Sequence, residues 1–319
     1  MVAVLAGGTG GAKLARGLLD VVGPERLTVI ANTGDDVEVH GVHVSPDPDL
    51  VTWWLGDLID ERGWGIRDDT WQVMDALETA GRPVWFRLGD RDLAMCLIRT
   101  ELMRGGMRQT EAHAEVVRAA GAPAAVLPMT DQPVRTQVKS GGAWRSFQEF
   151  MIVERGEAEV EGVAYRGIEA ARPTREVVEA LAGAEAIVIG PSNPITSIGP
   201  ILAMPGMREA IHRAAAPVIA VSPFVGGRSI KGPTEAFMRR AGLELGAAGA
   251  AAAYAGLVDG LVSDESPDLE TAPPPRRGDR LALLREDTLM DSAESRERVA
   301  ARTLEFARSL APPGLGSPR

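Results

Sequence analysis

The stretch Val2-Ala-Val-Leu-Ala-Gly7-Gly8-Thr9-Gly10-Gly11-Ala12-Lys13-Leu14 decides the fold. A short apolar run ends in four glycines, and a helical pattern follows with Leu14, Leu18 and Leu19 on one face. A strand, a glycine loop and a helix in this order are typical of α/β proteins that bind phosphate. Glycine lets the backbone approach the anion, and the start of the helix offers N–H groups and a positive dipole end. The structural alternative is a tight glycine turn at the end of a strand.

Two known phosphate-binding fingerprints nearly fit this stretch, and neither does. A P-loop needs Ser or Thr after its lysine, where this chain has Leu14. A dinucleotide fingerprint that starts at Gly8 would need glycine where Lys13 stands. An NAD-dependent dehydrogenase is disfavoured further, because Asn32 occupies the place where an acidic ribose partner is expected.

Composition and charge narrow the function classes. The chain has 319 residues, 45% of them hydrophobic, and a net charge of -10. An acidic protein repels the nucleic-acid backbone, so we expect no nucleic-acid partner. Cys96, the single cysteine, lies in an apolar helical pattern, where we expect core packing. No apolar run approaches the ~20 residues of a membrane span, and no signal peptide is evident, so we expect a cytoplasmic protein without membrane contact.

A second group of polar residues follows the strand predicted at Leu27–Ala31, namely Asn32-Thr33-Gly34-Asp35-Asp36. Ligands in open α/β sheets gather beyond the carboxyl ends of strands, so these residues should face the glycine loop. The alternative is a solvated turn, in which Asp is common. Asp36, Asp47 and Asp49 are expected to converge on Mg²⁺, with Asp36 and Asp47 as the metal ligands. Asp49 has the alternative role of capping the helix that follows it.

Two further loops carry aromatic and charged residues. Trp64, between two glycines, either packs against the core or stacks on a flat ring. Arg87 and Arg91 are candidates to hold phosphates or carboxylates. Asp90 or Asp92 is expected to cap the helix that carries Leu93, Leu97, Ile98 and Leu102.

The remaining pattern predicts one α/β domain over residues 1–319, a Rossmann-like three-layer fold with a mostly parallel sheet. Residues 134–166 alternate and contain Gly141-Gly142, which indicates a small β-hairpin insertion. The other expected elements are helices at 109–121, 176–181, 242–256 and 292–310, strands at 124–128, 186–190, 218–222 and 258–262 (the last core strand), a surface loop at 267–280 and a disordered tail at 311–319. The strand at 186–190 runs into a polar loop, Gly190–Pro200, which is the second candidate site.

These motifs together resemble the 2-phospho-L-lactate transferase family of coenzyme F420 biosynthesis. The resemblance runs from residue 1 to about residue 310 and rests on unusual motifs in the right order. They are Gly7-Gly-Thr-Gly10 with Lys13, Asn32-Thr33 with Asp35-Asp36, Ser45-Pro-Asp47-Pro-Asp49, Leu88-Gly-Asp-Arg-Asp92 and Gly190-Pro-Ser-Asn-Pro-Ile-Thr-Ser-Ile-Gly-Pro200. Some relatives carry Thr-Pro at Gly11-Ala12 and Lys at Arg87, and both departures keep the chemistry.

The resemblance implies a reaction. A phospholactyl group, or in some bacteria a phosphoenolpyruvyl group, moves from a guanosine diphosphate-linked donor to the terminal ribityl hydroxyl of Fo (7,8-didemethyl-8-hydroxy-5-deazariboflavin). GMP leaves, and Mg²⁺ is required. The choice between lactate and enolpyruvate stays open.

Carried onto this chain, the resemblance places Fo at Asp49 and Arg87. It places guanosine and diphosphate at Gly8, Thr9, Gly10, Gly11, Lys13, Asn32, Gly190, Pro191, Ser192, Asn193, Thr196 and Ser197. Asp49 and Asp36 are the expected catalytic carboxylates, with Asp49 favoured as the general base.

A non-enzymatic alternative remains: a related family with the same glycine loop binds nucleotide sugars and regulates carbon metabolism. It would need the nucleotide site but no Fo site. The expected partners are small molecules, and a homodimer is compatible with the sequence, which leaves the oligomeric state open.

Overall fold

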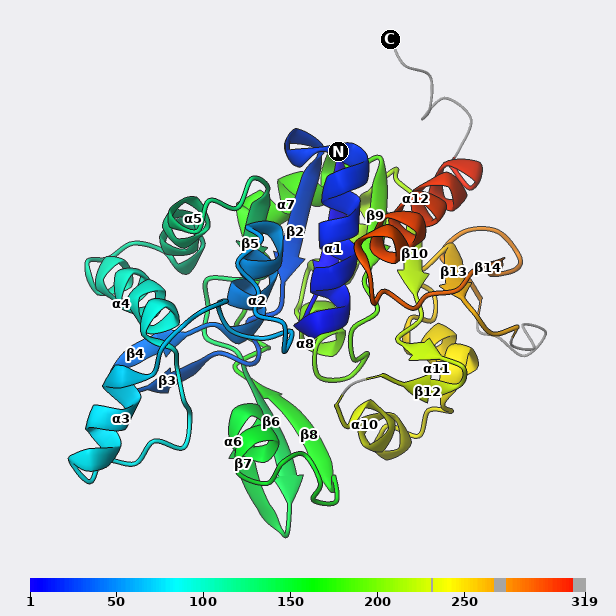
Figure 1. Cartoon of the computed structure of the whole chain (residues 1–319). Coiled ribbons are helices and arrows are strands. Elements are labelled where there is room, and N and C mark those ends of the chain that lie inside the picture. The colour runs from blue at the N-terminus through cyan, green and yellow to red at the C-terminus, as the bar shows by residue number, and fades with distance from the viewer. Residues whose placement is uncertain (231, 267–273, 312–319) are drawn as a thin grey trace.

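A seven-stranded sheet forms the centre of the protein in a computed structural model that describes residues 1–230, 232–266 and 274–311. All of its neighbouring strands run parallel. The strand order is β14 (Ala282–Arg285), β13 (Gly260–Ser263), β10 (Val218–Val221), β9 (Ala186–Ile189), β1 (Val2–Ala6), β2 (Leu27–Ala31) and β5 (Ala125–Pro128). The order therefore reverses between β1 and β9, and the carboxyl ends of the strands point toward the bottom of the view in Figure 1.

Helices cover both faces of this sheet, and the side chains of β1 alternate between two cores. Val2, Val4 and Ala6 pack with α1 (Gly8–Val22), α2 (Pro46–Leu55), α5 (Gln109–Ala119) and α12 (Ala293–Ser309). Ala3 and Leu5 pack with α7 (Arg175–Ala182), α8 (Ile198–Ala203), α9 (Met207–Arg213) and α11 (Gly246–Ala253). Strands buried on both faces need continuous apolar sequence, which β1 and β2 have. The predicted Rossmann-like three-layer fold is confirmed.

Residues 134–166 form a separate antiparallel sheet below the main body in Figure 1, with strand order β7-β6-β8. Its elements are β6 (Arg135–Ser140), β7 (Ala143–Ser146), α6 (Phe147–Ile152) and β8 (Gly162–Arg166). The predicted β-hairpin insertion is confirmed, and the structure adds a third strand and a helix to it. We call this unit the insertion.

The remaining elements lie at the edges of the main body. They are η1 (Pro24–Arg26), β3 (Val37–Val39), β4 (Val42–Val44), α3 (Gln72–Thr79), α4 (Asp90–Arg104), β11 (Phe224–Val225), β12 (Arg228–Ser229) and α10 (Thr234–Arg240). The expectation that 258–262 holds the last core strand is wrong, because β14 pairs beyond it. Residues 267–273 of the expected surface loop and 312–319 of the expected tail lie outside the described residues. Within the described part, no helix combines the length and the apolarity needed to cross a membrane.

We predict that Gly17→Ala destabilises the protein by about 1–3 kcal/mol, the usual cost of overpacking. A Cβ at Gly17 would lie 2.3 Å from the Arg296 carbonyl oxygen, so α12 would have to move off α1. Urea unfolding measures the change. Gly183→Ala is the matched control, because its Cβ would meet its nearest neighbour, the Glu179 carbonyl oxygen, at 3.4 Å. Equal stability of the two variants would contradict the prediction.

Candidate functional site

The glycine loop after β1 and the loop after β9 touch each other where the strand order reverses. Gly10 has no room for a side chain, because a Cβ would lie 2.0 Å from the Pro191 carbonyl oxygen. The Gly7 amide donates a hydrogen bond to the Ser192 hydroxyl oxygen (3.3 Å). Gly8 has φ = +65°, a left-handed conformation that glycine adopts without strain. The two loops thus face one crevice, as their positions at strand ends predict.

The first cavity lies between these loops and has a volume of about 370 Å³. Most of the residues predicted to bind the nucleotide line it, namely Gly8, Thr9, Gly10, Lys13, Pro191, Ser192, Asn193, Thr196 and Ser197. Gly11, Asn32 and Gly190 are buried and do not line it. A Cβ at Gly190 would lie 2.9 Å from Gly11 Cα, so these glycines allow the two loops to approach each other.

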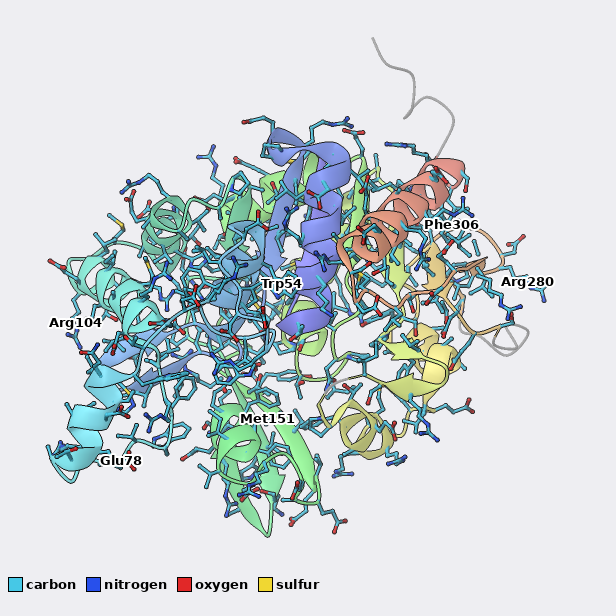
Figure 2. All side chains as sticks on the ribbon, in the orientation of Figure 1. Trp54, Glu78, Arg104, Met151, Arg280 and Phe306 are labelled. Atoms are coloured by element: carbon cyan, nitrogen blue, oxygen red, sulfur yellow. The ribbon has the colours of Figure 1, made fainter. Side chains whose placement is uncertain are left out.

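Lys13 brings a positive charge to the first cavity from α1. Its ammonium donates a hydrogen bond to the Met290 carbonyl oxygen (2.8 Å) and lies 6.0 Å from the ring centre of Trp54, which Figure 2 labels. A bound phosphate would therefore share this ammonium with protein groups.

Asp47 connects the start of α1 with the end of β2. Its Oδ1 accepts a hydrogen bond from the Gly8 amide (2.7 Å), and its Oδ2 accepts one from the Asn32 side-chain amide (2.9 Å). Burial raises the pKa of Asp47 to about 6, although both hydrogen bonds act to lower it. The carboxylate stands at the N-terminus of a helix, where the dipole favours a negative charge.

Asp35, one of the polar residues expected to face the glycine loop, lines the first cavity beside Asp47. The residue is 4% exposed, and its Oδ1 has no hydrogen-bond partner among the described residues. Burial raises the pKa of Asp35 well above its ordinary value, and the neighbouring charges of Asp47 and Asp36 raise it further. An ionised carboxylate in such a place is costly unless a cation accompanies it.

Asp36 lies elsewhere, in a buried polar network that lines neither cavity. Its Oδ1 accepts a hydrogen bond from the Ser45 hydroxyl (2.7 Å). Its Oδ2 contacts the Gln109 amide (2.7 Å) and His43 Nε2 (3.0 Å). With both oxygens engaged, Asp36 supports the loop rather than offering a ligand atom. The metal and catalytic roles of Asp36 stay predictions, and Asp35 is the adjacent carboxylate that lines the first cavity. Adjacent aspartates give no sign in sequence of which one turns toward the ligand.

A second cavity of about 550 Å³ adjoins the first. Asp47 and Trp64 line both cavities. The second cavity also contains Asp49 and Arg87, the two residues predicted to bind Fo, together with an apolar wall that includes Val44, Leu50, Trp53, Val84, Trp85, Phe86 and Ile152. Trp64 is 53% exposed and has the Arg62 guanidinium 4.4 Å from its ring centre, so it is not a core residue.

Asp49 is held by Arg99 of α4, a residue that the sequence analysis missed. Two guanidinium nitrogens donate to the two carboxylate oxygens (2.6 and 2.8 Å), and Arg99 is fully buried. Arg99 lies on the buried face of α4 with Leu93, Cys96 and Thr100, whereas Leu97 and Ile98 of the predicted apolar face are exposed, so the sequence pattern gave no signal for it. The capping role for Asp49 is wrong, because α2 begins at Pro46 with Ser45 as its N-cap.

The cap of α4 also differs from expectation. Gly89 is the N-cap of α4, and the Asp69 carboxylate accepts hydrogen bonds from the Arg91 and Asp92 amides (2.8 and 3.1 Å). Asp90 instead accepts from two amides at the start of α3 (both 3.0 Å). Asp92 is therefore not used as a cap, and it lines the second cavity.

Arg87 lies at the rim of the second cavity, where it pairs with Asp75 and, at 3.4 Å, with Glu78. These partners are on α3, and Glu78 is labelled in Figure 2. Arg91 lines neither cavity, and its guanidinium donates to the Arg67 carbonyl oxygen (2.9 Å). Of the two candidate arginines, Arg87 borders the second cavity and Arg91 borders neither of these two cavities.

Helix α6 of the insertion contributes to both cavities. Phe147 and Met151, one turn apart, line the first cavity, whereas Gln148 and Ile152 line the second. Figure 2 labels Met151 on the side of the insertion nearest the main body. Successive positions on one short helix therefore cover two neighbouring cavities, a contribution that the sequence pattern alone did not indicate.

The family model for 2-phospho-L-lactate transferase CofD matches residues 2–297. The chain belongs to the 2-phospho-L-lactate transferase family. It is thus an enzyme of a transferase family that acts in coenzyme F420 biosynthesis. A 2-phospho-L-lactate transferase of Methanosarcina acetivorans is 40% identical over 298 residues, which are 93% of this chain and 96% of that protein. A phosphoenolpyruvate transferase of Kitasatospora aureofaciens is 36% identical over 317 residues, which are 97% of this chain and 98% of that protein.

Solved structures show the same fold in a protein of low sequence identity. Two structures of a UPF0052 family protein from Bacillus halodurans superpose with TM-scores of 0.52 and 0.54 at 21% and 19% sequence identity. They cover 85% and 94% of this chain, and this chain covers 82% and 89% of theirs. At this identity the likeness establishes the fold alone.

We predict that Arg99→Met lowers the free energy of unfolding by about 3–5 kcal/mol, because it leaves the Asp49 charge buried without a partner. Urea unfolding checks this. Arg104→Met, on the same helix but exposed and labelled in Figure 2, is the control and should change stability by less than about 1 kcal/mol. The double variant Asp49→Leu/Arg99→Met should recover much of the loss. A similar loss of stability in Arg99→Met and in Arg104→Met would refute the prediction.

Proposed function

We propose that this enzyme transfers a phospholactyl or phosphoenolpyruvyl group from a guanosine diphosphate-linked donor to the ribityl hydroxyl of Fo, with release of GMP. The observation that carries this proposal is the pair of adjoining cavities that share Asp47 and Trp64. A transfer between two large substrates needs two sites that meet at the reacting atoms. The family and its relatives of both donor types support the proposal.

The first cavity suits the guanosine and diphosphate of the donor. Gly8, Thr9 and Gly10 open α1, whose first-turn amides and dipole favour anions. Lys13 adds positive charge, and Ser192, Asn193, Thr196 and Ser197 add neutral hydrogen-bonding groups from the facing loop.

The second cavity suits the flat, polar ring of Fo. Its aromatic wall would contact the ring faces, while Arg87 and Asp49 offer a cation and an acceptor at separate points. Because Arg99 holds both oxygens of Asp49, that carboxylate has a fixed orientation in the second cavity. We therefore assign to Asp49 the binding of the acceptor hydroxyl. A regulator that binds only nucleotide sugars would have no use for this second cavity.

Asp35 and Asp47 are the residues that would hold Mg²⁺. The fit rests on two buried carboxylates beside one cavity and on the Asp35 Oδ1 atom that has no partner in the described structure. Carboxylate oxygens are the ligands that Mg²⁺ prefers, usually shared with substrate phosphates. When bound, the ion would neutralise charge on the diphosphate.

The transfer requires positioning and charge neutralisation more than covalent participation of the protein. The hydroxyl oxygen of Fo forms a bond to the phosphorus that carries the acyl group. The bond from that phosphorus to the bridging oxygen of GMP breaks, and GMP leaves with the electron pair. Helix α6, which lines both cavities, would exclude water from the phosphorus between them.

The proposal predicts GMP release that requires both Fo and a donor. Purified protein would be incubated with Fo, Mg²⁺ and either the lactyl or the enolpyruvyl guanosine diphosphate, with GMP and product mass as readouts. Arg87→Ala should weaken Fo binding by roughly 10–100-fold, the range for a lost charged hydrogen bond, and leave GDP affinity unchanged. Arg91→Ala is the matched control. Nucleotide binding without any change in deazaflavin fluorescence would instead indicate the regulator.

The magnesium assignment predicts that MgCl₂ raises the melting temperature of the wild type at pH 8 and has a much smaller effect on Asp35→Asn. Without Mg²⁺, the difference in stability between the wild type and Asp35→Asn should depend on pH. A carboxyl with a raised pKa binds its proton more tightly in the folded chain, so ionisation destabilises the wild type as pH rises above about 4. Asp35→Asn lacks this loss, and its advantage should grow with pH. The exposed Asp68→Asn variant is the control. An Mg²⁺ response that persists in Asp35→Asn would remove the residue from the site.

A further inference from the structure

Asp92 is a carboxylate of the second cavity that the proposed function does not yet use. It lies in the first turn of α4, half-buried, and lines the cavity together with Asp49. Ligand atoms of Asp49, Asp92 and Cys96 all lie within 4.8 Å of one another. Asp92 therefore stands beside the group to which we assign the acceptor hydroxyl.

The two neighbouring carboxylates differ in their partners. Both oxygens of Asp49 accept charged hydrogen bonds from Arg99, at 2.6 and 2.8 Å. The carboxylate of Asp92 has, among the residues that the structure describes, only the Cys96 thiol at 4.0 Å as a donor. Arg87, the cation at the cavity rim, is paired with α3 instead. Asp92 thus has oxygens that are free to accept a proton from a ligand.

This cluster is not a metal site. The Arg99 guanidinium already occupies it, 3.5 Å from the Cys96 sulfur and in contact with Asp49. A second positive charge would be placed against the first. A role for Asp92 in accepting a proton from a ligand would place no second cation beside Arg99.

The charges around Asp92 set its proton affinity near neutrality. Burial raises its pKa to about 7, the Asp49 and Asp69 charges raise it as well, and Arg99 acts in the opposite direction. The Cys96 thiol, whose own pKa is raised by burial, faces it as a neutral group. Groups with a pKa near the working pH are the most effective general bases.

We propose that Asp92 is the general base that takes the proton of the acceptor hydroxyl, with Asp49 as the positioning residue. The proposal rests on the proposed function. In the step, the O–H bond of the ribityl hydroxyl breaks and its proton moves to a carboxylate oxygen of Asp92. The hydroxyl oxygen forms the new bond to phosphorus, and the phosphorus–oxygen bond to GMP breaks.

The test compares Asp92→Asn with Glu101→Gln, a matched loss of one carboxylate on an exposed position of the same helix. Single-turnover rates, Fo affinity, GDP affinity and melting temperature would be measured for each. Asp92→Asn should lower the transfer rate by roughly 10²–10⁴-fold, the range for a lost general base, with both affinities within about threefold of the wild type. The wild-type kcat/KM should rise with pH through about 7, and this limb should disappear in Asp92→Asn. Glu101→Gln should keep both the wild-type transfer rate and the rise of kcat/KM with pH.

Asp92→Glu guards against misfolding of the amide variant, since it keeps a carboxylate and moves it by one methylene. It should retain a pH limb at a shifted position and a reduced rate. A folded Asp92→Asn with wild-type rate and limb, or an unshifted limb in Asp92→Glu, would overturn the role of Asp92 while leaving the transferase function intact. A wild-type protein that binds no Fo and releases no GMP from either donor would overturn both.

Discussion

The reversal of strand order between β1 and β9 is the constraint on which the site depends. All seven strands run parallel, so the loops that follow β1 and β9 leave the same edge of the sheet and diverge to opposite faces. The crevice between them is a property of the topology. Glycine at position 10 lets the loops come into contact, since any side chain would meet the Pro191 carbonyl. Backbone geometry therefore brings the start of α1 and the polar loop after β9 together around the first cavity, whatever side chains they carry.

Negative charge is concentrated at this edge, and each carboxylate is compensated differently. Asp47 has backbone and side-chain amides, Asp36 has a serine, a glutamine and a histidine, and Asp49 has an arginine. Asp35 and Asp92 have the fewest partners, and burial raises the pKa of both. Buried charges without partners are costly, and proteins retain them chiefly where a ligand or a reaction uses them. Asp35 and Asp92 are therefore the two carboxylates for which we propose that a ligand or the reaction provides the compensation.

The insertion gives the two cavities a common boundary. Its helix α6 presents Phe147 and Met151 to one cavity and Gln148 and Ile152 to the other. Positions i and i+4 lie on one face of a helix, so this division follows from a helix laid along the border between the cavities. A segment that interrupts the α/β pattern in sequence thereby joins the walls of two substrate sites.

The sequence by itself determined the layered fold and both loops of the first cavity. The family resemblance also placed Asp49 and Arg87 at one site, and both line the second cavity. Apolar strands, glycine turns and helical periodicity are local signals, and motif order carried the family. Only the tertiary structure decided which of two adjacent aspartates faces the cavity, that Asp92 lines the second cavity instead of capping a helix, and that Arg99 holds Asp49. Those outcomes depend on side-chain direction and on partners about 50 residues apart in the chain, because Arg99 and Asp49 meet only when α4 packs against α5 and β4. The partner that compensates a buried charge is a residue close to it in space, and the order of residues along the chain does not show which residue that is.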